Sequence, residues 1–264
     1  MPHRASSALG TPCWIDLIST EPDLVTPFYT GLFGWSSERS GEGDEDYVMF
    51  YLDGQAVAGL GPNTPGSDLP DSWTVYMAVA DVDETIAAVQ KAGGRTVVPA
   101  TTVGPEGRFA LIVDPGGAVL GLWEAGQQSG LEVIAEPGAP VWFELNTLDI
   151  DAALPFYRDV FGWQFQPLGA EGMRYETAVV EGEQVCGIFD AKGSLPDGSV
   201  SHWHAYLGTA DTDATVEQAL EFGGKLTAEP FDTEYGRIAH ILDPSGAAVA
   251  LCSIPAAEDE ETPG

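Results

Sequence analysis

The chain repeats itself once along its length, and this duplication limits the folds open to it more than any other feature. The segment FYTGLFGW at residues 28–35 returns as FYRDVFGW at 156–163, with five of eight positions identical. Three further blocks recur in the same order at offsets of 128 to 130 residues: 12–17 as 140–145, 73–83 as 203–213, and 107–118 as 236–247. A repeat this long indicates two copies of one globular module rather than a solenoid of short units. Function should lie where the two modules meet or where they differ.

Each copy predicts the same order of secondary-structure elements. In the first copy, residues 13–18 alternate as a strand does, residues 19–23 supply helix-start side chains, and Gly34 ends the helix. A hairpin over 47–60 turns at Asp53-Gly54. A strand over 73–79, a helix over 82–92 and a hairpin over 109–123 complete the copy. The second copy predicts a strand at 141–146, helices at 151–161 and 212–222, a strand at 203–207, and hairpins about residues 181–182 and 243–244.

The predicted fold class is α+β, with two tandem βαβββ modules pairing into a cup-shaped mixed sheet and helices on the outside. The modules are expected at residues 11–125 and 139–254, joined by a Gly- and Pro-containing linker at 126–138. Residues 1–10 form an N-terminal extension. Residues 255–264 are acidic and expected to be disordered.

Charge and cysteine usage narrow the classes of partner. Ten basic residues against 41 acidic ones give a net charge of −31, which repels phosphate backbones and anionic lipids. We therefore expect no nucleic-acid partner and no membrane partner. Three cysteines far apart, at positions 13, 186 and 252, and the lack of an apolar start indicate reduced thiols in a cytoplasmic protein. The expected partner is a small molecule, bound by a monomer or a homodimer.

The motifs resemble those of the vicinal oxygen chelate superfamily, which includes glyoxalase I, extradiol dioxygenases and bleomycin-resistance proteins. The resemblance rests on the Phe-Tyr-x₃-Phe-Gly-Trp helix end and the Asp-Pro-x-Gly-Ala hairpin, each present twice. It extends over nearly the whole chain. Within the superfamily the chain is similar to tandem two-module proteins of actinobacteria, among them a mycobacterial glyoxalase-like antigen. The resemblance implies a ligand held in the cup of the sheet, but a fold alone does not give chemistry.

Metal-dependent members of that superfamily place ligands on the first, fourth and last strands of each module. The residues at these positions here are Trp14, Thr74, Gly121, Trp142, His204 and Ala250. Only His204 has a side chain that binds metal, and a divalent metal needs three or four suitable ligands. We therefore expect no metal and no cofactor of the usual kind.

Two carboxylates keep other chemistries open. Asp16 and Glu144 follow Trp14 and Trp142 by two residues, so they should point to the same face of their strands. With His204 they could act as displaced metal ligands. Either could instead act as a general base if aromatic surroundings raise its pKa. The alternative is that both only form hydrogen bonds with neighbouring strands or face water.

Aromatic residues are the candidates for ligand binding. Trp14 and Trp142 occupy matched cup positions, where they could hold a flat ligand between them or simply fill the cups. Tyr76 and Tyr206 should share that face with Thr74 and could orient a ligand through their hydroxyl groups.

Three further residues complete the candidate site. Trp123 has the same strand parity as Gly121 and could extend the aromatic wall. Arg108 and Arg237 stand at matched positions, where they could bind a ligand carboxylate or anchor the neighbouring acidic loops.

Three functional hypotheses follow. The first is a protein that binds a small aromatic or amphipathic molecule, either sequestering it or acting on it as a metal-independent lyase, isomerase or cyclase. The second is a metal-dependent glyoxalase, epimerase or dioxygenase that uses His204 with Glu144 or Asp16. The third is an interaction protein with sealed cups. The second module is the more polar candidate for the active site.

Overall fold

The structure is a computed structural model that describes residues 7–40, 47–63, 70–169, 172–196 and 198–254. The acidic tail predicted to be disordered lies outside the described residues. Among the helices of the described ranges, none is long and apolar enough to cross a membrane.

The two modules contain the same elements in the same order. The first consists of β1 (Pro12–Ser19), α1 (Pro22–Phe33), β2 (Ser36–Ser40), β3 (Tyr47–Leu52), β4 (Gln55–Pro62), β5 (Ser72–Ala78), α2 (Val82–Lys91), β6 (Arg95–Val103), β7 (Gly107–Val113) and β8 (Val119–Ala125). The second consists of β9 (Pro140–Thr147), α3 (Ile150–Phe161), β10 (Gln164–Pro167), β11 (Tyr175–Val180), β12 (Glu183–Asp190), β13 (His202–Thr209), α4 (Thr212–Glu221), β14 (Lys225–Thr233), β15 (Gly236–Leu242) and β16 (Ala248–Ser253).

Each module forms its own eight-stranded mixed sheet. The strand orders are β2-β3-β4-β1-β5-β8-β7-β6 and β10-β11-β12-β9-β13-β16-β15-β14. At the centre of the first sheet, β1 pairs in parallel with β4 and antiparallel with β5, and β9 pairs in the same way with β12 and β13. The predicted α+β class and the two repeated modules are confirmed. Each module contains two βαβββ units, whereas the sequence predicted one.

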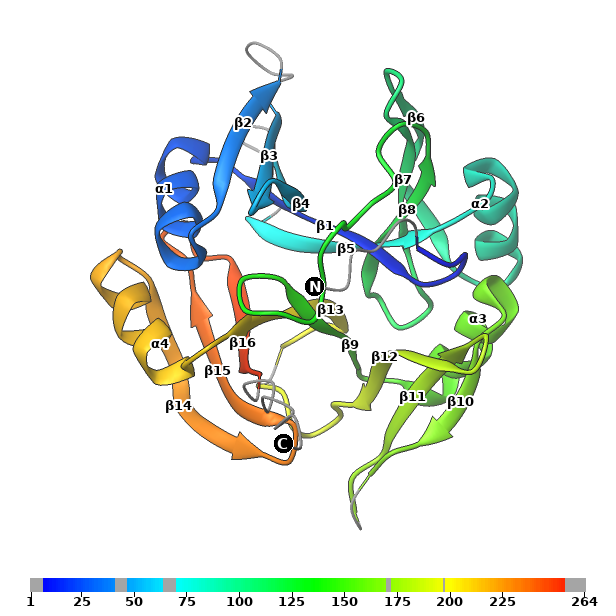
Figure 1. Ribbon diagram of the computed structural model, residues 1–264. Helices are drawn as coiled ribbons and strands as arrows, with labels where there is room; N and C mark the ends of the chain where they lie inside the picture. The colour runs from blue at the N-terminus through cyan, green and yellow to red at the C-terminus, as the bar shows by residue number, and fades with distance from the viewer. Residues whose placement is uncertain (1–6, 41–46, 64–69, 170–171, 197, 255–264) are drawn as a thin grey trace, which may run out of the picture.

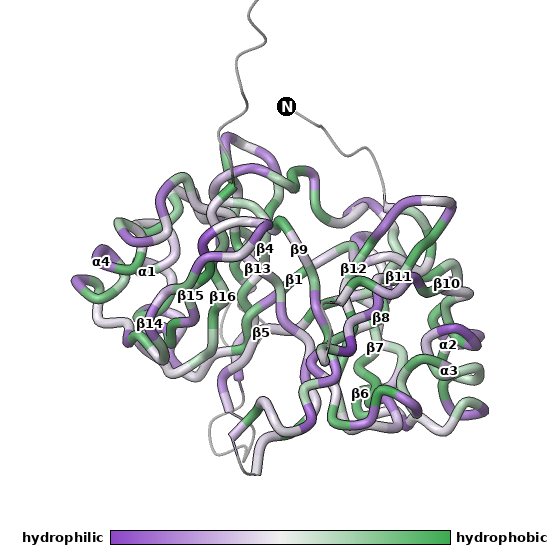
Figure 2. The backbone as a smooth tube through the Cα atoms, turned by 90° about the horizontal axis from the view of Figure 1, so that it is seen from below, coloured by the Kyte–Doolittle hydropathy of each residue, from purple (hydrophilic) through white to green (hydrophobic). Residues whose placement is uncertain are grey.

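The two sheets curve in opposite directions (Figure 1). The outer strands β2–β3 and β6–β7 extend away from the second module, and β10–β11 and β14–β15 extend to the opposite side. Helices α1 and α4 lie side by side on one flank, and α2 and α3 on the other, in both views (Figures 1 and 2). The helices thus lie on the outside, as predicted. We call the concave face of β1–β8 the first cup and that of β9–β16 the second cup.

The convex faces of the central strands pack module against module. Ile15 and Trp73 of the first module line a void of only about 10 Å³ together with Ala205 and Leu207 of the second. The repeated tryptophans that follow α1 and α3 stabilise the same interface. Trp35 donates its indole N–H to the carbonyl oxygen of Gly138 at 2.7 Å, and Trp163 donates to that of Gly10 at 2.6 Å. Buried apolar contact with satisfied polar groups makes the two modules one packed body.

The two predicted turns between β3 and β4 and between β11 and β12 are confirmed. Asp53 and Gly54 have φ values of 49° and 81°, and Glu181 and Gly182 have values of 53° and 91°. Two successive positive φ angles are typical of a tight two-residue hairpin, whose twist matches that of the flanking strands.

Four strands were missed by the sequence analysis, namely β2, β6, β10 and β14. All four are the edge strands of the two sheets. β2 is exposed along its whole length, and β6, β10 and β14 each contain a proline. Edge strands bury little side-chain surface and therefore lack the apolar residues that mark the central strands, and proline is tolerated there.

Candidate functional site

Strands β1, β5, β9 and β13 present their even-numbered residues to the cups, as the alternation predicted. In the first module Trp14 lies opposite Tyr76, and Asp16 opposite Thr74. A methyl group on Gly121 would lie 2.0 Å from the Tyr76 ring, so the ring rests directly on this glycine of β8. The side chains of Trp14, Asp16, Thr74 and Tyr76 therefore share the concave face of the first sheet with Gly121.

A buried carboxylate stands at the base of the first cup. Tyr76 donates a hydrogen bond to Oδ2 of Asp16 at 3.0 Å, and Tyr47 of β3 donates to the same oxygen at 3.5 Å. Trp14 in turn donates its indole N–H to the Tyr47 hydroxyl at 3.1 Å. The aromatic side chains therefore hold the carboxylate from two sides.

Burial dominates the chemistry of Asp16. Loss of solvent raises its pKa to about 7, although the hydrogen bonds from Tyr76 and Tyr47 act in the opposite direction. Its second oxygen, Oδ1, is buried without a hydrogen-bond partner. Since a carboxylate disfavours an apolar setting, this group carries a proton below about pH 7.

The second cup repeats this arrangement, with one tyrosine on each oxygen of the carboxylate. Tyr175 donates to Oε2 of Glu144 at 2.8 Å and Tyr206 donates to Oε1 at 3.1 Å. Trp142 donates its indole N–H to the Tyr175 hydroxyl at 2.9 Å. Burial raises the pKa of Glu144, and the two tyrosine hydrogen bonds oppose that rise.

Histidines distinguish the second cup from the first. His204 replaces Thr74 and lies opposite Glu144 on the neighbouring strand, with its Nε2 3.6 Å from Glu144 Oε1. Rings of His202 and His240 lie 5.8 and 6.2 Å from the His204 ring, centroid to centroid. Burial, followed by the neighbouring His202 and His240, lowers the pKa of His204 to about 3, so its imidazole is neutral.

The amide of Asn146 joins two of these rings. Its Nδ2 is 3.2 Å from Nδ1 of His204 and 3.5 Å from Nε2 of His202. Asn146 is a buried neighbour of Glu144 on β9. The corresponding residue of the first module is Ile18, so this polar link belongs to the second cup alone.

The two cups also differ in exposure. Trp14, Asp16, Thr74 and Tyr76 are all buried, with exposed fractions of 6 to 8%. Their counterparts Trp142, His204 and Tyr206 are half-buried. The second cup is therefore the more accessible of the two.

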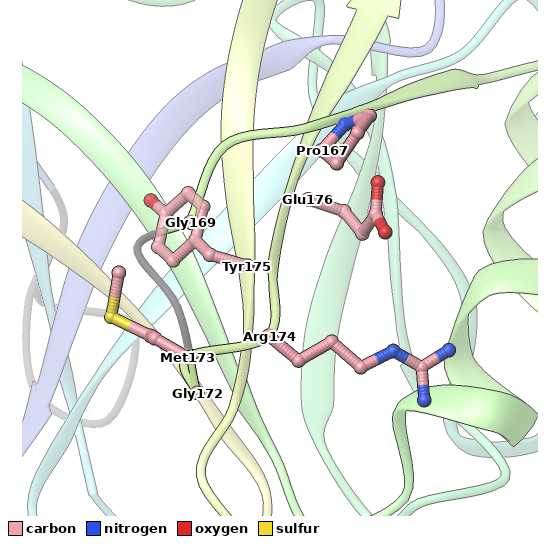
Figure 3. Close-up of a pocket in the computed structure, with 7 residues that line it drawn as sticks. All are labelled: Pro167, Gly169, Gly172, Met173, Arg174, Tyr175 and Glu176. Atoms are coloured by element: carbon pink, nitrogen blue, oxygen red, sulfur yellow. The ribbon is translucent and has the colours of Figure 1, made fainter.

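A hollow of about 340 Å³ lies where β10 and β11 approach the second cup (Figure 3). Its described lining includes Met173 and Tyr175, which point away from Arg174. Arg174 extends to the other side, where it forms an ion pair with Asp151 of α3 at 2.8 Å. Tyr175 is the lining residue that also contacts Glu144, through its hydroxyl group.

The residues in the cups do not fit a metal centre of the kind that the family resemblance implies. Of the six ligand positions, the indoles of Trp14 and Trp142, the hydroxyl of Thr74 and the small residues Gly121 and Ala250 offer no suitable donor set. Asp16 and Glu144 lie in different cups, and only Glu144 comes near His204. Within the described residues, no group of three or more His, Cys, Asp or Glu side chains is placed to hold a metal ion.

Three of the ligand-binding candidates do not point freely into a cup. Trp123 shares the cup face but donates its indole N–H to the carbonyl of Gln128 at 2.9 Å. Arg108 lies on the opposite face, where it forms ion pairs with Asp83 and Glu124 at 2.8 and 3.3 Å. The guanidinium group therefore ties β7 to α2 and β8.

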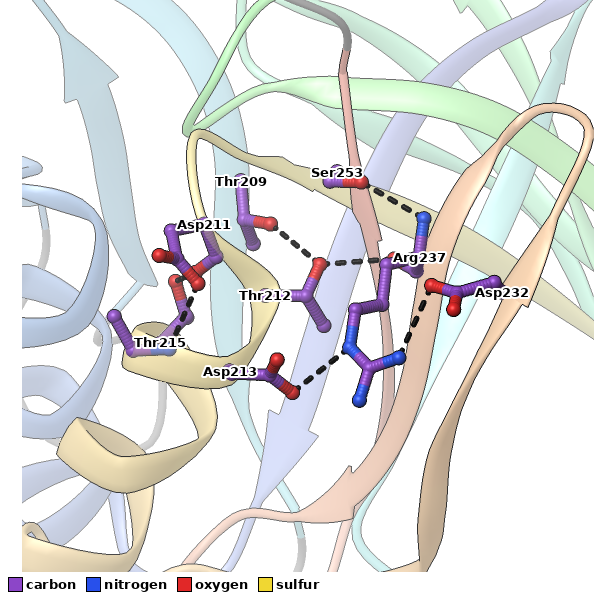
Figure 4. A network of polar contacts seen from close by, with 9 residues as sticks. Thr209, Asp211, Thr212, Asp213, Thr215, Asp232, Arg237 and Ser253 are labelled. Carbon is purple, nitrogen blue, oxygen red and sulfur yellow. Dashed lines mark hydrogen bonds and ion pairs between the residues drawn. The ribbon is translucent and has the colours of Figure 1, made fainter.

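Arg237 repeats this arrangement in the second module (Figure 4). It forms ion pairs with Asp213 of α4 and Asp232 of β14, at 2.9 and 3.0 Å. The alternation of β15 directs its neighbours Ile238 and His240 to the cup and Arg237 away from it. The alternation of side chains along β7 and β15 would have been enough to predict that both arginines point away from the cups.

Sequence reasoning overlooked Tyr47, Tyr175 and Asn146. The two tyrosines recur at an offset of 128, the same as Trp14 and Trp142, so the repeat itself carried the signal. Asn146 lacked such a signal because its counterpart is an isoleucine.

The comparisons with known proteins agree with this architecture. Residues 14–122 and 139–251 match the Glyoxalase/Bleomycin resistance protein/Dioxygenase superfamily. CFP32, a Mycobacterium tuberculosis protein named as a glyoxylase, is 38% identical over 257 residues, which cover 95% of this chain and 97% of that protein. The anthracycline biosynthesis protein DauV of Streptomyces sp. (strain C5) is 36% identical over 271 residues, covering 96% and 98%.

Solved structures share the fold at much lower identity. The Mn(II)-bound glyoxalase from Novosphingobium aromaticivorans aligns with a TM-score of 0.62 at 15% identity, over 93% of this chain and 82% of that one. A catechol 2,3-dioxygenase aligns with a TM-score of 0.60 at 14% identity, over 96% and 97%. This likeness establishes the fold and leaves the chemistry to the residues of the cups.

Proposed function

Because the chain belongs to the Glyoxalase/Bleomycin resistance protein/Dioxygenase superfamily, we propose that it binds a small aromatic molecule in the second cup and exchanges a proton with it through Glu144. The observation that carries this proposal is the half-open aromatic setting of a single buried carboxylate. No step of the proposal requires a metal.

The lining of the second cup suits a flat, partly apolar ligand. Trp142, Tyr175 and Tyr206 offer aromatic surface, while their polar atoms are already engaged with one another or with Glu144. Aromatic walls with a few fixed polar groups are typical of small-molecule sites.

Glu144 has the environment of an acid–base group. Burial raises its pKa toward the range in which a carboxyl can both accept and return a proton. The hydroxyls of Tyr175 and Tyr206 fix its position in the cup, one on each carboxylate oxygen.

Two relatives support the choice of ligand class. DauV and DnrV, the latter from Streptomyces peucetius and 35% identical over 266 residues, are named as anthracycline biosynthesis proteins. Anthracyclines are built on a planar fused-ring skeleton that carries ketone and phenol oxygens. A ligand of that chemistry matches the aromatic walls and the carboxyl group of the second cup.

Titration with 1,8-dihydroxyanthraquinone, followed by quenching of tryptophan fluorescence, tests the proposal. Trp142→Ala should weaken binding by about ten-fold or more, the loss of roughly 1.4 kcal/mol of binding free energy. The matched variant Trp14→Ala should leave the dissociation constant within about two-fold. Equal effects of both changes, or of neither, in folded proteins would place the ligand elsewhere.

A further inference from the structure

We infer that His204 is held by Asn146 as a neutral hydrogen-bond donor beside Glu144, so that the second cup removes a proton from carbon next to a carbonyl group. Glu144 and His204 would touch the substrate, and Asn146 would act as a positioning residue. This inference rests on the proposed function and adds to it the class of reaction and of substrate.

The chain of hydrogen bonds determines which nitrogen of His204 carries hydrogen. It begins at the carbonyl oxygen of Val200, which can only accept and lies 2.9 Å from Nδ1 of His202. His202 therefore carries a hydrogen on Nδ1, and in the neutral ring its Nε2 is an acceptor. The group that faces this Nε2 must then be a donor, which assigns the NH₂ of Asn146 to that side.

The same NH₂ group faces Nδ1 of His204 at 3.2 Å. Since the amide nitrogen can only donate, Nδ1 of His204 accepts, and the hydrogen of the neutral ring must lie on Nε2. Asn146 thus sets the tautomer of His204 from the side away from Glu144.

The Nε2–H group that results is buried and has no hydrogen-bond partner. It lies 3.6 Å from Oε1 of Glu144, which is longer than a hydrogen bond. An unsatisfied buried donor destabilises the folded protein. An oxygen of a bound ligand would satisfy it, which identifies the missing partner as a hydrogen-bond acceptor.

A donor beside a carboxylate base suits an enolisation. An oxygen of Glu144 takes the proton from the carbon next to a carbonyl, and the electron pair of that C–H bond becomes a C=C bond. The carbonyl π electrons move to the oxygen, whose developing charge is stabilised by the Nε2–H of His204. The carboxylic acid then returns the proton to the same or another carbon, so that the step is an isomerisation with no oxidant or reductant.

A neutral imidazole suits this role better than a charged one. Burial keeps the ring neutral, so the ring can donate a hydrogen bond without adding a full positive charge beside Glu144. Triosephosphate isomerase solves the same chemical problem with the same pairing, a carboxylate base and a neutral histidine that polarises the carbonyl group.

The first cup provides an internal comparison. Thr74 and Ile18 stand where the second cup has His204 and Asn146, so the first cup offers a carboxyl group without the imidazole donor. The reaction is therefore expected in the second cup alone. Its substrates would be aromatic ketones with an acidic C–H group beside the carbonyl.

Nitrogen-15 NMR of the full chain labelled at histidine tests the tautomer without reference to activity. We expect His204 to show a protonated Nε2 and a bare Nδ1, assigned by the loss of its signals in His204→Gln. Asn146→Leu should give a mixture of both tautomers. A wild-type His204 with its hydrogen on Nδ1, or with two hydrogens near neutral pH, would overturn the inference.

Hydrogen–deuterium exchange tests the reaction. With 2-tetralone as probe in D₂O, the wild-type protein should accelerate exchange at the carbon next to the carbonyl, and Glu144→Gln should abolish the acceleration. His204→Leu should lower the rate at saturating probe by about 100- to 1,000-fold, the usual size for loss of one such donor, whereas Asn146→Leu should lower it only in proportion to the Nε2–H tautomer that is lost. Asp16→Asn should leave it unchanged.

The two proposals can fail separately. If 1,8-dihydroxyanthraquinone does not bind in the second cup, the proposed function fails and this inference with it. If it binds there as expected, but 2-tetralone bound in the same cup exchanges no faster than with Glu144→Gln, the ligand-binding part of the proposed function stands, and the proton transfer through Glu144 is overturned together with the present inference.

Discussion

Tyr29 in helix α1 of the first module donates a hydrogen bond of 2.8 Å to Oδ2 of Asp243 in the second module, across 214 residues of sequence. The reciprocal bond joins Tyr157 of α3 to Asp114 at 2.9 Å. These residues belong to the two repeated motifs, so the tyrosine of one motif pairs with the aspartate of the other motif in the opposite module. The motifs that revealed the duplication are therefore the contacts that hold its two copies together.

Tyr29→Phe should destabilise the protein by roughly 1–3 kcal/mol. The change leaves the buried Asp243 without this donor, and it removes the acceptor for the indole N–H of Trp73, which lies 3.0 Å from the Tyr29 hydroxyl. Tyr157→Phe, which likewise removes the donor to Oδ2 of Asp114 and the acceptor for the indole N–H of Trp203, should cost a similar amount. Urea unfolding measures both. The control Tyr235→Phe, at a residue 58% exposed, should change the midpoint little, and equal midpoints for all three variants would contradict the role of the pair.

Asp16 should make the stability of the protein depend on pH. Its folded pKa of about 7 lies above the value of about 3.9 of an unfolded chain. The folded state therefore binds more protons between these values, so its extra stability is complete below about pH 4 and is lost as the pH rises to about 7.

Asp16→Asn should remove that dependence. The difference in free energy of unfolding between variant and wild type should therefore be more favourable to the variant at pH 8 than at pH 4, by on the order of 3 kcal/mol. Tyr47 and Tyr76, which face Asp16, ionise at higher pH because burial raises their pKa. Urea unfolding at several pH values measures the effect. Parallel profiles for wild type and variant would show that Asp16 does not titrate in this range.

The sequence predicted the central strands and their cup-facing residues because both follow from repetition and alternation. Trp14, Asp16 and Tyr76 alternate on strands that are buried on both faces, and the same pattern returns in the second module. The edge strands escaped prediction because their residues face water, as in the fully exposed β2.

The side-chain contacts within the cups were less predictable than the sheet face to which each residue points. Tyr47 and Tyr175 reach Asp16 and Glu144 from β3 and β11, which are separated from the carboxylates by 31 residues and one intervening strand. Only the order of strands in the sheet brings them together. The tautomer of His204 depends on an even finer detail, the direction of one amide.

Arg237→Ala should leave ligand binding unchanged. Its guanidinium group pairs with Asp213 and Asp232 on the face away from the second cup, and such exposed ion pairs contribute little. The dissociation constant for 1,8-dihydroxyanthraquinone should stay within about two-fold of wild type, measured by the same fluorescence titration. A ten-fold loss would return Arg237 to the set of ligand-binding residues.

Gly187→Ala should alter the acid–base behaviour of Glu144 without touching it. A methyl group at this position of β12 would lie 1.8 Å from the hydroxyl oxygen of Tyr175, so the ring must shift. The shift weakens the 2.8 Å hydrogen bond that Tyr175 donates to Glu144, and that bond lowers the pKa of the carboxyl.

The pKa of Glu144 should therefore rise in Gly187→Ala, because a hydrogen bond that favours its ionised form is weakened. The acidic limb of the pH profile for 2-tetralone exchange should move upward by the same amount, since the base must be ionised to act. Gly59→Ala is the matched control, because it displaces Tyr47 in the first cup by the same geometry, at 1.8 Å. An identical shift in both variants would mean that the limb reports overall stability, whereas a shift in Gly187→Ala alone ties the ionisation to Glu144.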